Sequence, residues 1–219
     1  MTRRRINVAL AQLAVLLLGA CVTTNHTSYR ETTDPTSPLD RQVVYHLDRA
    51  FYKDPPDCVV VMSSRDTINS QLALMIEESI ARHLTMKVSR IIGPAERRRL
   101  ERELAVDLSS TEGQKRLGQA TNCRGFLSWR TLEVADGYAL VYSSRSLGLE
   151  LEMTRLSDDT TLWSASHVTQ RWDGGIPLSP FSIAFSAFEA TQFHTDQDIL
   201  PSMVDDAVRR IFVTLPDMR

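Results

Sequence analysis

The chain has 219 residues, of which 42% are hydrophobic and 24% are charged, and its formal net charge is −2. These values exclude a wholly disordered chain. The 25 Lys and Arg against 27 Asp and Glu leave no basic excess, so we expect no nucleic-acid partner. Nine Gly and nine Pro exclude a collagen-like chain, and three Cys are too few for a disulfide-stapled miniprotein. The length favours one domain.

The N-terminus has the parts of a secretory signal peptide. Residues 3–5 are arginines, and Val8–Leu18 is a mostly apolar run that is short for a permanent membrane span. Leu18–Ala20 leads directly to Cys21, an order that resembles a bacterial lipobox. The resemblance implies that residues 1–20 are removed and that Cys21 is lipidated. A plain signal peptide and an N-terminal anchor helix remain as alternatives.

Lipidation of Cys21 would make membrane lipid the first partner of this protein. Each buried CH₂ contributes about 0.8 kcal/mol, so two or three acyl chains hold firmly where one holds weakly. Val22, and not Asp, follows the cysteine. By resemblance to enterobacterial sorting, this favours the periplasmic face of the outer membrane over the inner membrane. Cleavage removes three Arg and no acidic residue, which leaves a mature net charge of −5 and no reason for general docking on anionic lipid.

Residues 22–40 are rich in Thr, Ser and Pro and lack apolar periodicity, which predicts a flexible tether over residues 21–40. A tether of this length spans roughly 60 Å when extended and typically about 25 Å. The remaining residues, 41–219, are expected to form a single domain that can move well clear of the membrane.

The first predicted elements of that domain are a helix and a strand. Residues 40–52 carry Val43, Val44, Leu47 and Phe51 at helical spacing, which predicts a short helix. Cys58–Met62 is an unbroken apolar run, which predicts a central strand buried on both faces.

Helices dominate the next segment. Apolar residues at three- and four-residue steps predict an amphipathic helix over 68–84, with Asp66 or Thr67 as its N-cap. A second strand is expected over 87–92. Pro94 then predicts the start of a charged, mostly solvated helix, and the capping-box spacing of Ser109–Glu112 predicts another that ends near residue 120.

The pattern then changes to that of a sheet. Strands are expected over residues 123–134, 138–156 and 160–172, with turns at Asp136-Gly137 and at residues 157–159. The middle strand alternates between apolar and polar residues, which predicts one buried and one wet face. The apolar members are Leu147, Leu149, Leu151 and Met153.

After residues 174–180 the chain becomes rich in phenylalanine. Phe181, Phe185 and Phe188 are candidates for an apolar surface that contacts a partner. A loop and short helix folded over the core is the alternative. Residues 199–212 then carry the strongest helical stripe of the chain, with acidic residues near the start and Arg209 and Arg210 near the end.

The order of elements predicts an α/β (α+β) fold, as a single three-layer-like sandwich with a mixed sheet. A βαβ unit is followed by an antiparallel meander and a C-terminal helix.

Two segments carry a family resemblance. Residues 117–127 and Met153–Trp163 resemble motifs of periplasmic lipoproteins related to the curli secretion-channel lipoprotein and to the TolB amino-terminal domain. The resemblance covers about residues 57–215 and implies the fold given above. Two features depart from the family: its turn glycine is Asp159 or Thr160 here, and the sequence shows no clear pair of long membrane-spanning hairpins, which argues against pore formation.

No pattern of catalytic or metal-ligating residues emerges, so we expect no catalytic residue, metal or cofactor. The five His lack metal-ligand spacing, and P-loop, G-x-S-x-G and G-x-G-x-x-G motifs are absent. The polar cluster His194–Asp198 fits either cation binding or, preferably, helix capping by Asp196 or Asp198. Cys58 and Cys123 each begin a predicted strand, and these form either a disulfide or two separate buried thiols.

Together these features predict a membrane-anchored periplasmic lipoprotein that acts without catalysis, as a binding or assembly accessory of the cell envelope. Its partner would be an unidentified envelope protein or a second copy of the chain. A subunit of an oligomeric secretion channel is the alternative, and a metal-dependent or hydrolytic enzyme is a third class.

Overall fold

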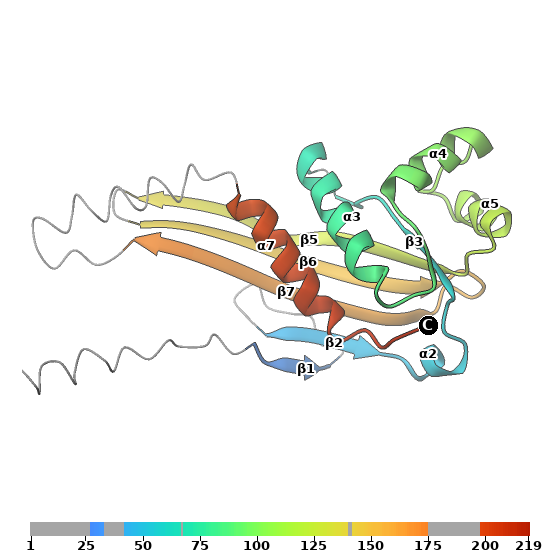
Figure 1. The fold of residues 1–219 in the computed structure, drawn as a ribbon, viewed down its shortest axis with the longest axis horizontal. Coiled ribbons are helices and arrows are strands. Elements are labelled where there is room, and N and C mark those ends of the chain that lie inside the picture. Colours follow the sequence, from blue (N-terminus) through green and yellow to red (C-terminus); the bar gives the residue numbers. More distant parts are fainter. Residues whose placement is uncertain (1–26, 33–41, 67, 140–141, 175–197) are drawn as a thin grey trace, which may run out of the picture.

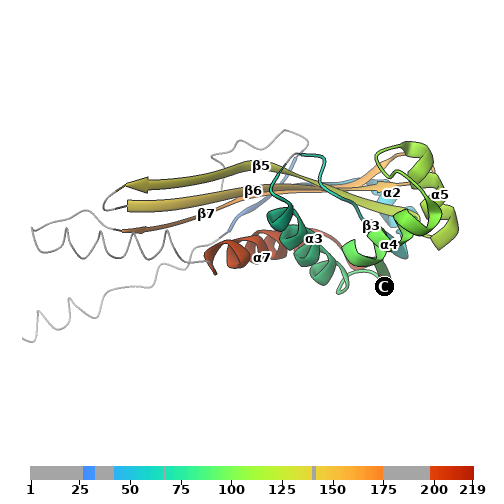
Figure 2. The ribbon, with the colours of Figure 1, turned by 90° about the horizontal axis from the view of Figure 1, so that it is seen from above.

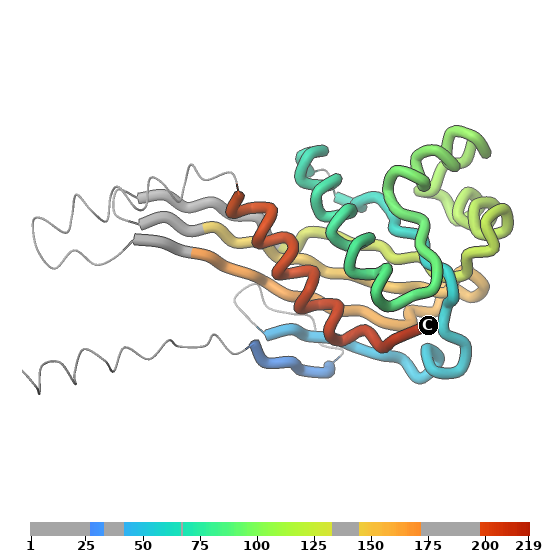
Figure 3. The backbone as a smooth tube through the Cα atoms, in the orientation of Figure 1, coloured from blue at the N-terminus to red at the C-terminus, as the bar shows by residue number. Residues whose placement is uncertain are grey.

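The computed structural model describes residues 27–32, 42–66, 68–139, 142–174 and 198–219 (Figures 1 and 3). The strands are β1 (Tyr29–Glu31), β2 (Val43–Leu47), β3 (Cys58–Val61), β4 (Arg90–Ile92), β5 (Gly125–Ala139), β6 (Tyr142–Arg155) and β7 (Thr161–Gly174). The helices are α2 (Arg49–Lys53), α3 (Ser70–Leu84), α4 (Pro94–Leu104), α5 (Thr111–Thr121) and α7 (Ile199–Phe212). These elements form a mixed sheet with helices packed on it, which confirms the predicted fold class.

The seven strands lie in the order β1-β2-β7-β6-β5-β3-β4. Strand β3 pairs in parallel with both β4 and β5, so β3, α3 and β4 make the predicted βαβ unit. Strands β5, β6 and β7 pair antiparallel as the predicted meander. Strand β2 joins β7 antiparallel, and β1 joins β2 in parallel. Strands β1 and β4 are therefore the two edges of the sheet.

The sheet has a hydrophobic core on each face. Figure 2 shows α3 and α7 together on one face. We call the apolar cluster on that face the large core; it includes Val59, Val61, Ile76, Ile80, Leu84, Leu127, Trp129, Leu149, Leu151, Met153, Trp163, Met203, Val204, Ala207, Val208 and Ile211. The small core lies on the other face of β3, against α4 and α5, and is made of Cys58, Val60, Met62, Ile92, Leu108, Leu117, Cys123 and Phe126.

Strand β6 shows why one face is dry and the other is wet. Leu147, Leu149, Leu151 and Met153 are each fully buried. Between them, Glu150 and Glu152 point to the opposite face and are only half-buried. Because successive side chains of a strand point to opposite faces, the alternation alone placed this strand correctly.

The helix predicted over residues 40–52 is wrong in its first half. Val43–Leu47 forms strand β2, and only Arg49–Lys53 is helical, capped by the Asp48 carboxylate. Short apolar runs fit both helical and strand periods. The segment forms a strand because it pairs with β7, from Val44 opposite Ser166 to Leu47 opposite Trp163.

Two predicted turn or cap positions are also wrong. Helix α3 begins after Asn69, whose side-chain oxygen accepts hydrogen bonds from the amides of Gln71 and Leu72, so Asp66 and Thr67 are not its N-cap. Strand β5 continues through the predicted turn at residues 136–137, because these two residues pair with β6, and ends at Ala139. The longer ladder with β6 overrides the local Asp-Gly signal.

Part of the predicted tether belongs to the domain. Tyr29–Glu31 forms β1 and pairs with Val43–Tyr45 of β2, so the sheet begins eight residues after Cys21. A composition rich in Thr and Ser does not prevent a short edge strand, because pairing with an existing sheet supplies the hydrogen bonds.

The predicted start of α4 is confirmed at Pro94. Helix α5 is also present, but its N-cap is Ser110 and not Ser109, so it begins one residue later than the predicted capping box implies. Helix α7 carries the predicted apolar stripe, which is buried. Asp198 occupies its N-cap position but makes no side-chain hydrogen bond to the helix amides, so capping by Asp198 is wrong. In the turn between β6 and β7, Asp159 has a φ of 55°. Asp tolerates this left-handed conformation better than most residues.

Candidate interaction surfaces

The residues singled out from the sequence divide into two groups. Cys21 lies outside the described residues, as do Phe181, Phe185 and Phe188 of the expected partner surface. His194 and Asp196 of the polar cluster lie outside them too. Cys58 and Cys123 are described, and the fold brings them together.

Cys58 and Cys123 form a disulfide, with their Cα atoms 4.8 Å apart and a sequence separation of 65. Cys58 is the first residue of β3, and Cys123 precedes β5, the parallel neighbour of β3. Both are buried in the small core beside Leu117 and Phe126. A bond between adjacent strands at this depth cross-links the region structurally and exposes no reactive thiol.

A first open surface lies on the wet face of β5 and β6. It is a hollow of about 370 Å³ lined mainly by polar side chains: Arg65, Asp66, Ser128, Trp129, Arg130, Glu150 and Glu152. Strand pairing sets Ser128 opposite Glu152 and Arg130 opposite Glu150. We call this surface the polar hollow.

Every carboxylate of the polar hollow has a partner. Arg130 donates two hydrogen bonds to Glu150, at 2.7 and 3.2 Å. Thr161 donates to Glu152 at 2.7 Å, and the amide and hydroxyl of Thr131 donate to Asp66. Exposed pairs of this kind stabilise a fold little and can exchange partners. Each of the three carboxylates of the hollow is therefore held by at least one side-chain or backbone donor.

A second open surface lies where the edge strand β1 meets the C-terminal residues. It is a groove of about 650 Å³ lined by Tyr29, Glu31, Tyr45, Leu47, Arg49, Tyr52, Lys87 and residues 213–216. We call it the tyrosine groove, because it collects three of the five Tyr of the chain. No periodic pattern predicts this groove, since its residues come from β1, β2, α2 and the segments that follow α3 and α7.

One group of side chains has the composition of a hydrolase triad but not its geometry. Ser79 and His83 of α3 both contact the same carboxylate oxygen, Oδ1 of Asp205 in α7, at 3.3 and 3.0 Å. A triad needs the histidine to accept the proton of the serine, and it needs an exposed serine. Ser79 is 1% exposed, so the group clamps α3 to α7.

The carboxyl end of β3, where α/β folds often bind ligands, is filled by a buried ion pair. Arg97 of α4 donates to the Val61 carbonyl oxygen at 2.7 Å and to Glu77 of α3 at 2.9 Å. Burial raises the pKa of Glu77, and Arg97 opposes that shift. The pair fixes α3 and α4 to the strand, which explains why the predicted solvated helix α4 buries one arginine.

No group of three or more His, Cys, Asp or Glu in the part of the chain that the structure describes could hold a metal ion. No helix among the described residues is long and apolar enough to cross a membrane.

No family model matches the chain, and no curated protein matches it. Several solved structures are similar at low identity. A PelC dodecamer from Paraburkholderia phytofirmans is 15% identical, with a TM-score of 0.47 over 78% of this chain and 96% of PelC. Lipoprotein GNA1162 from Neisseria meningitidis is 12% identical, with a TM-score of 0.41 over 59% of this chain and 92% of that protein. The LpoB C-terminal domain from Salmonella enterica is 11% identical, with a TM-score of 0.38 over 52% of this chain and 83% of that domain. Similarity at this level assigns no function to the chain.

Proposed function

We propose that this protein is a lipoprotein of the cell envelope, anchored by acylated Cys21 and acting as a non-enzymatic binding or assembly accessory. The observation that carries the proposal is the N-terminal sequence, in which a basic start and an apolar run lead through Leu18–Ala20 to Cys21. Val22 favours the periplasmic face of the outer membrane.

Two features of the domain support this location and role. The disulfide between Cys58 and Cys123 is of the kind that persists in oxidising compartments such as the bacterial periplasm. The polar hollow offers paired charges of both signs on an uncovered part of the sheet, a surface that can exchange its ion pairs for contacts with a partner protein.

The anchor is tested by Cys21→Ser. The wild-type protein should fractionate with membranes and carry acyl chains on an N-terminal Cys21 by mass spectrometry. The variant should leave the membrane fraction or retain its signal sequence. A matched control, Cys58→Ser combined with Cys123→Ser, removes the other two cysteines and should remain membrane-bound. Membrane retention of cleaved Cys21→Ser would contradict lipid anchoring.

The accessory role is tested by crosslinking in intact cells followed by mass spectrometry. The expected result is a recurrent envelope protein crosslinked near the polar hollow, and loss of that crosslink in Arg130→Glu. Arg99→Glu, on the exposed face of α4, is the control and should keep it. A stable ring of this chain alone in detergent would instead favour the channel subunit.

A further inference from the structure

We infer that the tyrosine groove is a membrane-docking surface, whose occupant is the headgroup layer of the bilayer that holds Cys21. The inference rests on the proposed lipidation of Cys21 and adds to it an orientation of the domain. A tethered domain without such a surface would tumble freely beneath the membrane.

The first support is the length of chain between the anchor and the sheet. The structure begins β1 at Tyr29, eight residues after Cys21. Eight residues reach about 26 Å when fully extended and typically about 16 Å. The body therefore cannot move well clear of the membrane, as a 19-residue tether would allow. The β1 edge, and the groove beside it, are the part of the sheet held nearest to the lipid.

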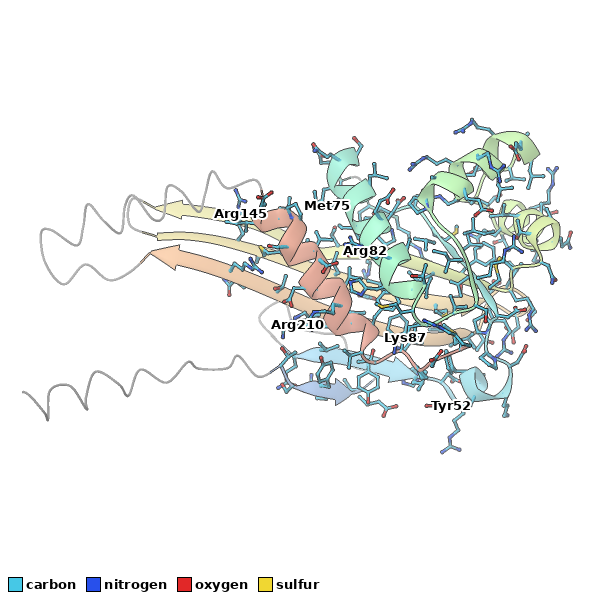
Figure 4. All side chains as sticks on the ribbon, viewed as in Figure 1. Tyr52, Met75, Arg82, Lys87, Arg145 and Arg210 are labelled. Atoms are coloured by element: carbon cyan, nitrogen blue, oxygen red, sulfur yellow. A yellow bond between two sulfur atoms is a disulfide. The ribbon has the colours of Figure 1, made fainter. Side chains whose placement is uncertain are left out.

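The second support is the chemistry of the groove. Tyr52 is 68% exposed, Tyr29 is 43% exposed and Val213 is 58% exposed, and these are among the most exposed large hydrophobic residues described. Tyrosine is enriched at membrane–water interfaces because its ring is apolar and its hydroxyl can remain hydrated. Figure 4 shows Tyr52 and Lys87 at the same end of the molecule, with α2 and the C-terminus.

The third support is the local charge, which differs from that of the whole protein. Arg49 and Lys87 line the groove against one acid, Glu31. Within the part of the chain that the structure describes, neither of these two cations forms an ion pair. Of the nearby acids, Asp54 is neutralised by Arg124 at 3.0 Å, whereas Asp48 accepts a hydrogen bond from the Ala50 amide and keeps its charge. A locally basic, tyrosine-lined surface fits a bilayer with anionic headgroups even though the mature chain is acidic.

The test measures which surface of the anchored protein meets lipid. Full-length acylated protein carrying Tyr52→Trp is reconstituted into vesicles of phosphatidylethanolamine and phosphatidylglycerol, with and without brominated acyl chains. The matched control is Leu74→Trp, on the exposed side of α3. We expect bromine quenching at position 52, corrected for the native Trp signal, to exceed that at position 74 by roughly twofold or more.

The role of charge has its own pair of variants. Adding Arg49→Glu and Lys87→Glu to Tyr52→Trp should reduce quenching to the level of position 74. Arg98→Glu with Arg99→Glu, a double reversal on exposed α4, should leave it unchanged. High salt should mimic the first pair, because it screens exposed charges. If quenching at position 52 changed neither with Arg49→Glu and Lys87→Glu nor with high salt, the electrostatic part of the inference would be overturned.

The outcomes separate this inference from the proposed anchor. If the protein neither carries acyl chains nor sediments with vesicles, the proposed function is wrong. If it sediments but positions 52 and 74 are quenched equally, membrane docking is wrong. Hydrogen exchange of the wild-type protein tests the same surface without a substitution that could disturb folding. Residues 43–53 should exchange more slowly on vesicles than in detergent. If residues 43–53 were protected equally in detergent and on vesicles, and the protein in detergent had the mass of a dimer, the groove would be the contact with a second copy of the chain. That result would overturn the inference.

Discussion

The two cores on opposite faces of the sheet share strands β3 and β5 but are stabilised differently. Val59 and Val61 point into the large core under α3 and α7, whereas Cys58 and Val60 point into the small core under α4 and α5. The large core consists of apolar packing across long strands and two helices. The small core contains the Cys58–Cys123 disulfide. A small cluster buries too little apolar surface to be robust alone, and a cross-link compensates for this.

The two faces of the sheet also differ in how much surface they leave open. The large core covers its face of β6 from Leu147 to Met153, so these side chains are unavailable for contacts. The other face is covered by the small core only at the end near β3, and the uncovered remainder of β5 and β6 carries the polar hollow. The face with the weaker core is therefore the one that leaves surface for a partner.

Removing the disulfide should have the largest effect on stability. Replacing Cys58 and Cys123 together by Ala should lower the free energy of unfolding by about 4 kcal/mol, the chain-entropy value for a loop of this length. Urea denaturation measures this loss in the free energy of unfolding of the whole domain. Hydrogen exchange should show amides of α5 losing protection before those of α7. Equal loss in both helices would mean that the two cores unfold as one unit.

Truncating a large-core side chain should cost slightly less. Leu151→Ala removes a fully buried side chain opposite Trp129 and should destabilise by about 2–5 kcal/mol. Its control is the preceding residue of the same strand: Glu150→Ala loses only its exposed pair with Arg130 and should cost at most about 1 kcal/mol. Similar costs for the two variants, measured by urea denaturation, would refute the contrast between the faces.

The smallest effect concerns pH. His167 of β7 lies opposite Leu149, and burial lowers the pKa of its imidazole below 6.5. The unfolded chain therefore binds a proton at a higher pH than the folded protein does. The stability due to neutral His167 is complete above pH 6.5 and is lost as the pH falls below it, by at most about 1.4 kcal/mol per unit. His167→Gln should flatten this dependence in urea melts; an unchanged slope would show that His167 does not titrate on unfolding.

The candidate surfaces could be predicted only in part. The Cys pair was recognisable because Cys58 begins β3 and Cys123 lies two residues before β5, and the parallel pairing of β3 with β5 then brought the two together. The polar hollow follows from the alternation of β6, but its partner residues on β5 needed the strand register. The tyrosine groove could not be predicted, because Tyr29, Tyr45 and Tyr52 lie on three different elements and Lys87 on a fourth segment.

The sequence by itself determined those elements whose periodicity is long and regular. The stripes of α3 and α7 and the alternation of β6 each repeat enough to exclude the other period. Tertiary structure decided the short or ambiguous segments. Val43–Leu47 became a strand because β7 offers it a hydrogen-bonding edge, and Tyr29–Glu31 became a strand because β2 then offers another. Such segments are too short to stabilise a conformation alone, so the neighbouring strand, which the local sequence does not contain, determines their structure.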